Sequence, residues 1–107
     1  MAGSLESRAV ALAHLAKKTG MDGVVCSAHE ARAIRRACGP KFVILIPGVR
    51  PRRGAANDQS RIATPAEAIR AGADYLVVGR PITAAPDPRS AVLAVVNEMK
   101  SALRHSR

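Results

Sequence analysis

Three short apolar runs, separated by segments with helical signals, constrain the fold of this chain more than any other feature of its sequence. The runs cover residues 23–26, 42–46 and 74–78. Each is bounded by turn residues and is apolar almost throughout, which predicts strands that are buried on both faces. Strands joined through helices pair in parallel by right-handed crossovers. We therefore predict an α/β fold with a parallel sheet that is covered on both faces.

Helix signals separate the apolar runs. The predicted helices cover residues 5–19, 27–37 and 66–70, and a fourth begins at Asp87-Pro88. Glycine follows each of the first three, and the second and third begin with Ser or Thr followed three residues later by Glu, the spacing of a capping box. Apolar residues at helical spacing predict one face of the first helix: Leu5, Ala9, Leu12 and Ala16. A similar stripe marks the last helix: Val92, Val95, Val96, Met99 and Leu103.

The length and hydrophobicity of the chain indicate one small soluble domain. Its 107 residues are 48% hydrophobic but include a single Phe, a single Tyr and no Trp, so the core must be aliphatic. No apolar run reaches the ~18 residues that a membrane span needs. The N-terminus lacks the layout of a signal peptide. We therefore expect a cytoplasmic protein.

The net charge indicates which partners the chain could bind, and the cysteine spacing indicates whether it could hold a metal ion. A formal charge of +9 favours anionic partners such as phosphorylated metabolites, nucleic acid or an acidic protein. Nucleic acid is the weaker choice, because aromatic residues that stack on bases are nearly absent and the basic residues are spread along the chain. Cys26 and Cys38 have no second Cys or His at metal-ligand spacing, which predicts reduced structural thiols and no metal site.

Polar residues that follow the strands are predicted to meet at one edge of the sheet. They are Ser27, the loop 47–59 and Gly79-Arg80. A doubly wound sheet and a piece of a (β/α)₈ barrel both fit, and both bind ligands at this edge. No Gly-x-Gly-x-x-Gly follows the first strand, whereas glycines follow the last two, where barrel enzymes place a phosphate site. The barrel and a phosphate site are therefore favoured, although Gly79 as a simple turn and Arg80 as a solvated side chain stay open at this point.

Several motifs in a fixed order resemble the orotidine 5′-phosphate decarboxylase family. The matching segments are DGVVCS at 22–27, IPGVRP at 46–51, NDQSR at 57–61, TPAEAI at 64–69 and AGADYLVVGRPIT at 71–83. The resemblance covers nearly the whole chain. It implies the C-terminal segment, about three βα units, of a (β/α)₈ TIM barrel of the ribulose-phosphate-binding type, with residues 1–107 forming one partial domain.

The resemblance also implies an activity and a set of site residues. The family converts orotidine monophosphate to uridine monophosphate and CO₂, the last step of de novo pyrimidine biosynthesis, without a cofactor and usually as a homodimer. Arg50, Gln59, Gly79 and Arg80 match its phosphate-binding residues. The arginines would act as charged donors, Gly79 would offer a backbone amide, and Gln59 would close the long loop over the substrate. Pro47 matches the proline that packs against the pyrimidine ring.

The family's catalytic array is missing from this chain. The family places a lysine within an Asp-x-Lys-x-x-Asp motif, with another lysine upstream, and no such motif occurs here. This chemistry needs a lysine to protonate the carbanion and aspartates to crowd the carboxylate. None of the four lysines is predicted at a C-terminal strand end: Lys17, Lys18, Lys41 and Lys100. We therefore predict no catalytic residue in this chain and no decarboxylase activity by the chain alone.

Two other functions stay open on the sequence. A related sugar-phosphate decarboxylase or aldolase barrel would share the fold, although the Pro-Gly-Val-Arg and Asp-Gln segments favour the pyrimidine enzyme. A non-enzymatic basic module that binds nucleic acid is supported only by the positive charge. Three parallel strands would also leave two unpaired edges and an open apolar face, so we expect the isolated chain to associate or to depend on the missing strands.

Overall fold

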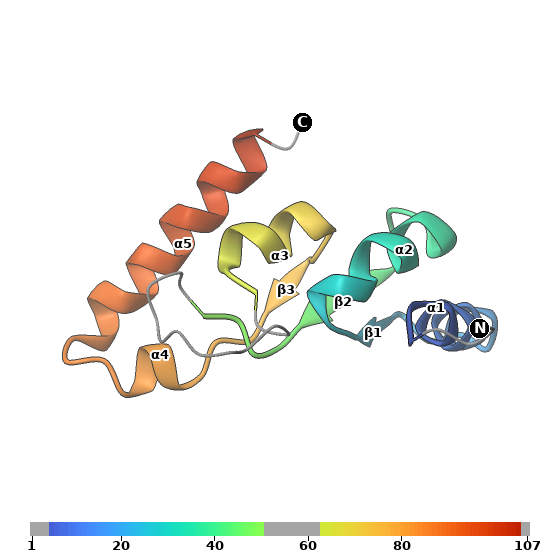
Figure 1. The fold of residues 1–107 in the computed structure, drawn as a ribbon, viewed down its shortest axis with the longest axis horizontal. Coiled ribbons are helices and arrows are strands. Elements are labelled where there is room, and N and C mark those ends of the chain that lie inside the picture. Colours follow the sequence, from blue (N-terminus) through green and yellow to red (C-terminus); the bar gives the residue numbers. More distant parts are fainter. Residues whose placement is uncertain (1–4, 51–62, 106–107) are drawn as a thin grey trace.

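A computed structural model describes residues 5–50 and 63–105. Helices and strands alternate along the chain (Figure 1). The elements in order are α1 (Leu5–Lys18), β1 (Gly23–Val25), α2 (Ala28–Cys38), β2 (Val43–Ile46), α3 (Pro65–Ala71), β3 (Tyr75–Leu76), α4 (Arg80–Thr83) and α5 (Pro88–His105). The predicted order of strands and long helices is confirmed. The four-residue helix α4, in a segment predicted to be a loop, was not predicted.

The sheet advances in one direction along the chain. β2 lies between β1 and β3, and both neighbours run parallel to it. Two successive right-handed crossovers in the same direction, through α2 and α3, place both helices on the same side of the sheet. A barrel continues in this way around its whole ring, and each half of a doubly wound sheet does so up to the point where the strand order reverses. The strand order is therefore compatible with the predicted barrel segment.

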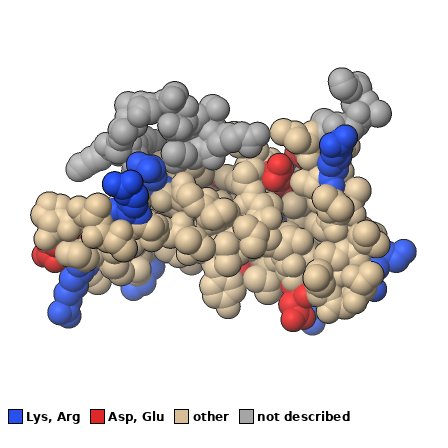
Figure 2. All heavy atoms as spheres, turned by 90° about the horizontal axis from the view of Figure 1, so that it is seen from below, with Lys and Arg blue, Asp and Glu red and all other residues tan. Residues whose placement is uncertain are grey.

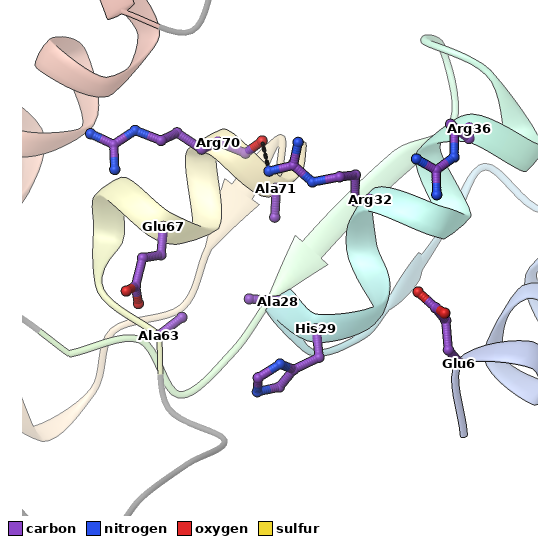
Figure 3. A pocket seen from close by; sticks show the side chains of 9 residues that line it. All are labelled: Glu6, Ala28, His29, Arg32, Arg36, Ala63, Glu67, Arg70 and Ala71. Carbon is purple, nitrogen blue, oxygen red and sulfur yellow. Dashed lines mark hydrogen bonds between the residues drawn. The ribbon is translucent and has the colours of Figure 1, made fainter. Parts of the chain in front are cut away.

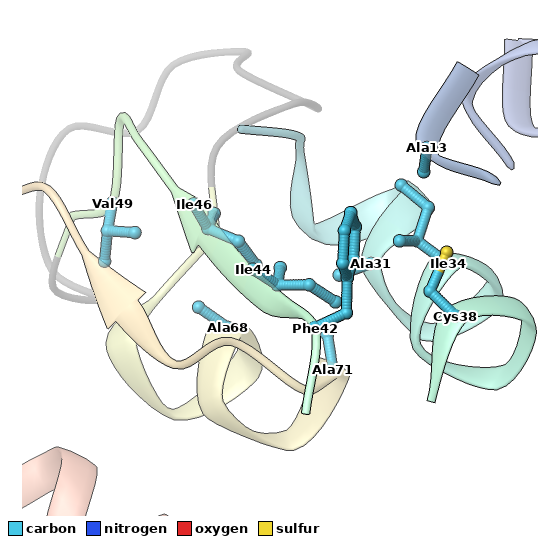
Figure 4. Close-up of a cluster of buried hydrophobic side chains, with 10 residues drawn as sticks. All are labelled: Ala13, Ala31, Ile34, Cys38, Phe42, Ile44, Ile46, Val49, Ala68 and Ala71. Atoms are coloured by element: carbon cyan, nitrogen blue, oxygen red, sulfur yellow. The ribbon is translucent and has the colours of Figure 1, made fainter. Parts of the chain in front are cut away.

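The helix-covered face of the sheet holds the core. Ile44 and Ile46 on β2 are fully buried, and they pack against small residues of α2 and α3 (Figure 4). The small helix residues let the backbones approach closely, while the isoleucines fill the space between the layers. The buried cluster comprises Ala13, Ala31, Ile34, Cys38, Phe42, Ile44, Ile46, Val49, Ala68 and Ala71. We call this side of the sheet the outer face.

The opposite side, which we call the inner face, has no cover in the described part of the chain. The register aligns Val25 with Leu45 and Leu45 with Tyr75, so these residues point to the same side. Val25 is 66% exposed and Tyr75 is 60% exposed. The expectation that three parallel strands leave an open apolar face is therefore confirmed. The prediction of a sheet covered on both faces is wrong for the described residues, because both crossover helices lie on the outer face.

The two ladders end for identifiable reasons. The Leu45 carbonyl accepts from Cys26 N–H at 3.1 Å, and Pro47, the next residue of that strand edge, has no N–H to donate. On the other edge the Ile46 carbonyl accepts from Val77 N–H at 3.0 Å. Gly48 then takes a φ of +71°, which turns the chain out of the extended conformation and leaves β3 with two residues.

An arginine on α2 fastens the N-terminal end of the sheet. Arg35 donates to the Asp74 carboxylate at 2.6 Å and to the Gly72 carbonyl at 2.6 Å. The same carboxylate accepts from Ile44 N–H at 2.9 Å. Arg35 also reaches the carbonyl of Phe42. We call this group the Arg35 clasp; it joins α2, β2 and the α3–β3 turn through charge-assisted hydrogen bonds.

The predicted apolar stripes of the first and last helices are each only partly buried. On α5, Val95 is buried, but Val92 and Leu103 of the predicted stripe are 39% and 51% exposed. In α1, Ala9, Ala13 and Ala16 contact the core, but Leu5 and Leu12 are 61% and 67% exposed. The predicted stripe is therefore wrong for these two leucines, which point away from α2. At the other end of the chain, α5 packs on α3 and α4 (Figure 1).

Candidate functional site

The C-terminal strand ends form one rim, and β2 and β3 are joined there beyond their last ladder residues. Val49 is buried, and its N–H donates to the Val77 carbonyl at 3.4 Å. Arg50 N–H donates to the Ala63 carbonyl at 2.9 Å. The first bond joins the segment after β2 to the end of β3, and the second joins it to the residues that precede α3.

The predicted phosphate-binding residues that the structure describes lie on this rim. Arg50 and Arg80 are exposed, and neither guanidinium has a hydrogen-bond partner among the described residues. Pro47 is also exposed, directly after β2. Gln59 lies outside the described residues. The rim therefore presents two arginines and a proline on neighbouring segments.

Gly79 begins the short helix α4 in open space. Its carbonyl accepts from Ile82 N–H at 2.9 Å and from Thr83 N–H at 3.0 Å. A Cβ built on Gly79 would have no neighbour within 4 Å among the described residues, so their packing does not explain a glycine at this position. The backbone angles of Gly79, φ −96° and ψ −100°, lie outside the regions that other residues favour, and close approach of a ligand to the backbone would also suit glycine.

The first strand contributes Cys26 and Ser27 to the rim. Ser27 caps α2, and its backbone N–H donates to the Glu30 carboxylate at 3.3 Å. Its hydroxyl oxygen is buried and has no partner in the part of the chain that the structure describes. Burial, with a smaller contribution from the nearby Glu30 charge, raises the pKa of the Cys26 thiol to about 11. Cys26 is therefore a neutral thiol at physiological pH and a poor nucleophile.

A hollow of about 530 Å³ lies between the outer helices (Figure 3). Its walls carry both signs of charge, with Arg32 and Arg36 from α2 and Glu6 from α1. Arg32 is engaged, because it donates to the Arg70 carbonyl at 3.2 Å. The hollow reaches the C-terminal rim at Ala28 and at Ala63, whose carbonyl accepts from Arg50 N–H, and extends from there along α2 and α3.

The rest of the surface was compared for basic clusters, metal-binding groups and membrane-spanning helices. Basic side chains stand in small separated groups on the face drawn in Figure 2. Within residues 5–50 and 63–105, no group of three His, Cys, Asp or Glu side chains could hold a metal ion. No helix in those same ranges is long and apolar enough to cross a membrane.

Sequence reasoning missed the residue that joins the two segments of the rim. Val49 carries no reactive group, yet its burial fixes the path of the chain between Pro47 and Arg50. The sequence does indicate that Val49 could be buried, because it is an isolated apolar residue at the start of a polar loop rich in glycine and arginine. The Thr83 hydroxyl, which donates to the Gly79 carbonyl at 3.4 Å, is part of the unpredicted helix α4.

Parallel strands that advance in one direction, helices on one side, and arginines and an open glycine at the C-terminal rim define a segment of a (β/α)₈ barrel enzyme. Residues 2–95 match the family described as Orotidine 5'-phosphate decarboxylase / HUMPS family. The chain belongs to this family.

Individual relatives agree with this assignment. The chain is 59% identical over 95 residues to an orotidine 5'-phosphate decarboxylase of Trichlorobacter lovleyi, a match that covers 89% of this chain and 39% of the relative. The corresponding protein of Geobacter sulfurreducens is 57% identical, with 89% and 40% covered. The crystal structure of orotidine 5'-phosphate decarboxylase from Lactobacillus acidophilus superimposes with a TM-score of 0.76 at 35% identity, over 92% of this chain and 39% of that one. The chain thus spans about two fifths of the length of these relatives.

Proposed function

We propose that this chain is the phosphate-holding C-terminal part of an orotidine 5′-phosphate decarboxylase. The observation that carries the proposal is the Val49–Val77 hydrogen bond, which joins the residue before Arg50 to the strand end that leads into Gly79-Arg80. Two guanidinium groups without a hydrogen-bond partner among the described residues, together with Gly79, suit a phosphate dianion, which accepts charge-assisted hydrogen bonds. The names of the relatives supply the substrate, orotidine 5'-phosphate, and the reaction, a decarboxylation, which would leave uridine monophosphate.

In the proposed reaction the chain binds and orients, and it does not perform the bond-breaking step. The bond between the pyrimidine ring and its carboxylate breaks, CO₂ leaves, and the electron pair that stays on the ring takes up a proton. The lysine and aspartates of the family's array, which would stabilise and protonate that carbon, are absent from the sequence. Arg50, Arg80, Gly79 and Gln59 would hold the phosphate, and Pro47 would contact the ring. Binding energy from a remote phosphate serves catalysis by fixing the reacting end of the substrate.

Three further properties belong to the same proposal. Residues 1–107 form one partial domain, the complete enzyme is a homodimer, and it acts in the cytoplasm without a cofactor. The relatives are named for a reaction on a small soluble metabolite, which supports a cytoplasmic enzyme.

A fusion protein that completes the barrel, which we call the grafted barrel, tests the proposal. The region of the Trichlorobacter lovleyi protein that precedes its match to this chain is fused to this chain, and the fusion is assayed for decarboxylation and for binding of uridine monophosphate. We expect turnover by the fusion and none by the chain alone. Arg80→Ala should weaken nucleotide binding about 10-fold to 100-fold, because a charge-assisted hydrogen bond contributes about 1.5–3 kcal/mol.

The matched control is Arg104→Ala, which removes an exposed arginine at the far end of α5 and should leave the affinity unchanged. An unchanged affinity of the Arg80→Ala fusion would contradict the proposed phosphate site. Turnover by the chain alone would contradict the proposed division of roles. Activity of the fusion on a sugar phosphate in place of the nucleotide would instead assign the chain to the sugar-phosphate branch of the family.

A further inference from the structure

Three arginines lie within five residues of α2, and the fold explains only part of this set. Arg35 forms the clasp to the sheet. Arg32 makes one hydrogen bond to a described residue, with its guanidinium donating to the Arg70 carbonyl at 3.2 Å. The Arg36 guanidinium has neither a hydrogen bond nor an ion pair in the described part of the chain. Packing and pairing therefore account for Arg35, but not for Arg36 and only in part for Arg32.

Arg32 and Arg36 lie one helical turn apart beside the same hollow. Residues four apart on a helix share a face, with Cβ atoms about 5–6 Å apart, and like charges at this spacing repel each other. Both arginines line the hollow of about 530 Å³ between α1, α2 and α3 (Figure 3). An anion held between the two guanidinium groups would replace this repulsion with charge-assisted hydrogen bonds.

The C-terminal end of α3 holds Arg32 in place over the hollow. The Arg70 carbonyl lies in the last turn of α3, where carbonyls have no partner within the helix, and it accepts from Arg32 instead. Figure 3 shows Arg32 reaching from α2 toward this carbonyl. A guanidinium group has several N–H donors in one plane, so this bond leaves others for a ligand. The small side chains of three alanines in the lining leave the space below unfilled: Ala28, Ala63 and Ala71.

The two carboxylates of the hollow are stabilised by the starts of helices. Glu67 accepts from Thr64 N–H at 2.9 Å in the capping box of α3. Glu6 lies in the first turn of α1, where the positive end of the helix dipole favours a negative charge. The guanidinium groups have no comparable counter-charge, and three arginines against two glutamates give the lining a net charge of +1 with His29 neutral. The hollow is therefore suited to an anionic ligand.

We propose that this hollow binds a compact oligophosphate, either free or as part of a nucleotide. Arginine binds phosphate through paired N–H groups, and linked phosphoryl groups would offer one anionic group to Arg32 and another to Arg36. The volume lies within the range of about 300–1,000 Å³ that small-molecule sites occupy. Neither Arg50 nor Arg80 lines the hollow, so this site is distinct from the proposed phosphate site at the rim.

The experiment titrates inorganic tripolyphosphate into the full chain carrying Arg80→Ala, with isothermal titration calorimetry at about 0.15 M salt. The substitution weakens the proposed rim site, and the salt screens charges that lie farther apart than about 8 Å. We expect saturable binding of one tripolyphosphate per chain. Arg32→Gln and Arg36→Gln should each weaken it about 10-fold to 100-fold, because each removes charge-assisted hydrogen bonds. The grafted barrel with Arg80→Ala should show the same binding, since this chain supplies the whole described lining of the hollow.

The matched control is Arg104→Gln, which removes the same charge from an exposed position on α5 outside the lining and should leave the affinity unchanged. An equal loss with this control would show that binding follows the net charge of the chain, and it would overturn the proposal. Absence of saturable binding in both the chain and the grafted barrel would overturn it as well.

A hexaglutamate peptide distinguishes a small ligand from an acidic protein segment. Tighter binding of the peptide than of tripolyphosphate would make the hollow a protein-docking surface and overturn the oligophosphate proposal, whereas weaker binding supports it. The proposed function is tested separately, by the effect of Arg80→Ala on nucleotide binding at the rim. Either proposal can therefore fail without the other.

Discussion

The two faces of the sheet are built from the same kinds of residue but lie in opposite environments. Ile44 and Ile46 on the outer face are buried under α2 and α3, while Val25 and Tyr75 on the inner face are mostly exposed. The strand sequences alone do not distinguish the faces, because both are apolar. The difference shows that the strands carry the composition of a complete barrel, of which this chain supplies the outer cover and leaves the inner cover to other strands.

The largest expected effect is a difference between the two faces in how much a substitution lowers the free energy of unfolding. Ile44→Ala should lower the free energy of unfolding by about 2–5 kcal/mol, both in the chain at low concentration and in the grafted barrel, because it leaves a cavity in the outer core. Val25→Ala should change the stability of the chain alone by less than about 0.5 kcal/mol. In the grafted barrel the same change should cost about 1–3 kcal/mol. Urea unfolding followed by circular dichroism measures all four values.

Equal costs for Val25→Ala in the chain and in the fusion would contradict the comparison. They would mean that the inner face is already covered in the isolated chain, for example by self-association. Repeating the measurement at several protein concentrations distinguishes that case.

A second prediction compares the chemical reactivity of the two faces. Cys26 packs against the outer core, and burial raises the pKa of its thiol from 9.0 to about 11. The thiolate is the reactive form, so at pH 8 alkylation by iodoacetamide should be about 100-fold slower at Cys26 than at a cysteine introduced by Val25→Cys. The rate at Cys26 should keep rising with pH until about 11, because its proton leaves only there. Peptide mass mapping assigns the label to each cysteine, and similar rates at the two positions would refute the assignment of faces.

The smallest effect concerns the Arg35 clasp, which fastens the outer cover to the sheet. Asp74→Asn keeps the shape of the side chain but removes the charge that accepts from Arg35 and from Ile44 N–H. We expect a loss of about 1–2 kcal/mol, since both bonds are partly screened at the surface. Asp22→Asn is the control, because that side chain makes no hydrogen bond within residues 5–50 and 63–105. If the two variants had equal free energies of unfolding in urea, the Arg35 clasp would not contribute to the stability of the fold.

Much of this fold follows from local sequence signals. Alternating apolar runs and helix signals predicted the parallel α/β order, and the glycines after the helices marked their ends. Gly72, for example, has a φ of +111° directly after α3. The predicted capping box at Thr64 is present, with Glu67 N–H donating to the Thr64 hydroxyl at 3.1 Å. These features depend on a few neighbouring residues, which is why a pattern reveals them.

The features that were missed depend on segments far apart in the chain. The exposure of Leu12 cannot be read from helical spacing, because it depends on which neighbouring helix is present. Likewise, the Val49–Val77 contact joins segments that follow different strands. At the rim, the positions of Pro47, Arg50, Gly79 and Arg80 after their strands agree with the prediction, whereas their roles toward a nucleotide stay predictions. Gln59 falls outside the described residues.

The Arg35 clasp lies at the opposite end of the strands from the rim, and this separation has an evolutionary consequence. Its donors and acceptors run from Arg35 to Asp74, so the clasp is inherited as one continuous stretch of gene. Recombination that moves residues 28–76 intact transfers α2, β2, α3 and β3 together with the clasp that attaches them to one another. The same stretch carries Pro47 and Arg50, so this part of the rim moves with its supporting strand, whereas Gly79 and Arg80 can be exchanged separately.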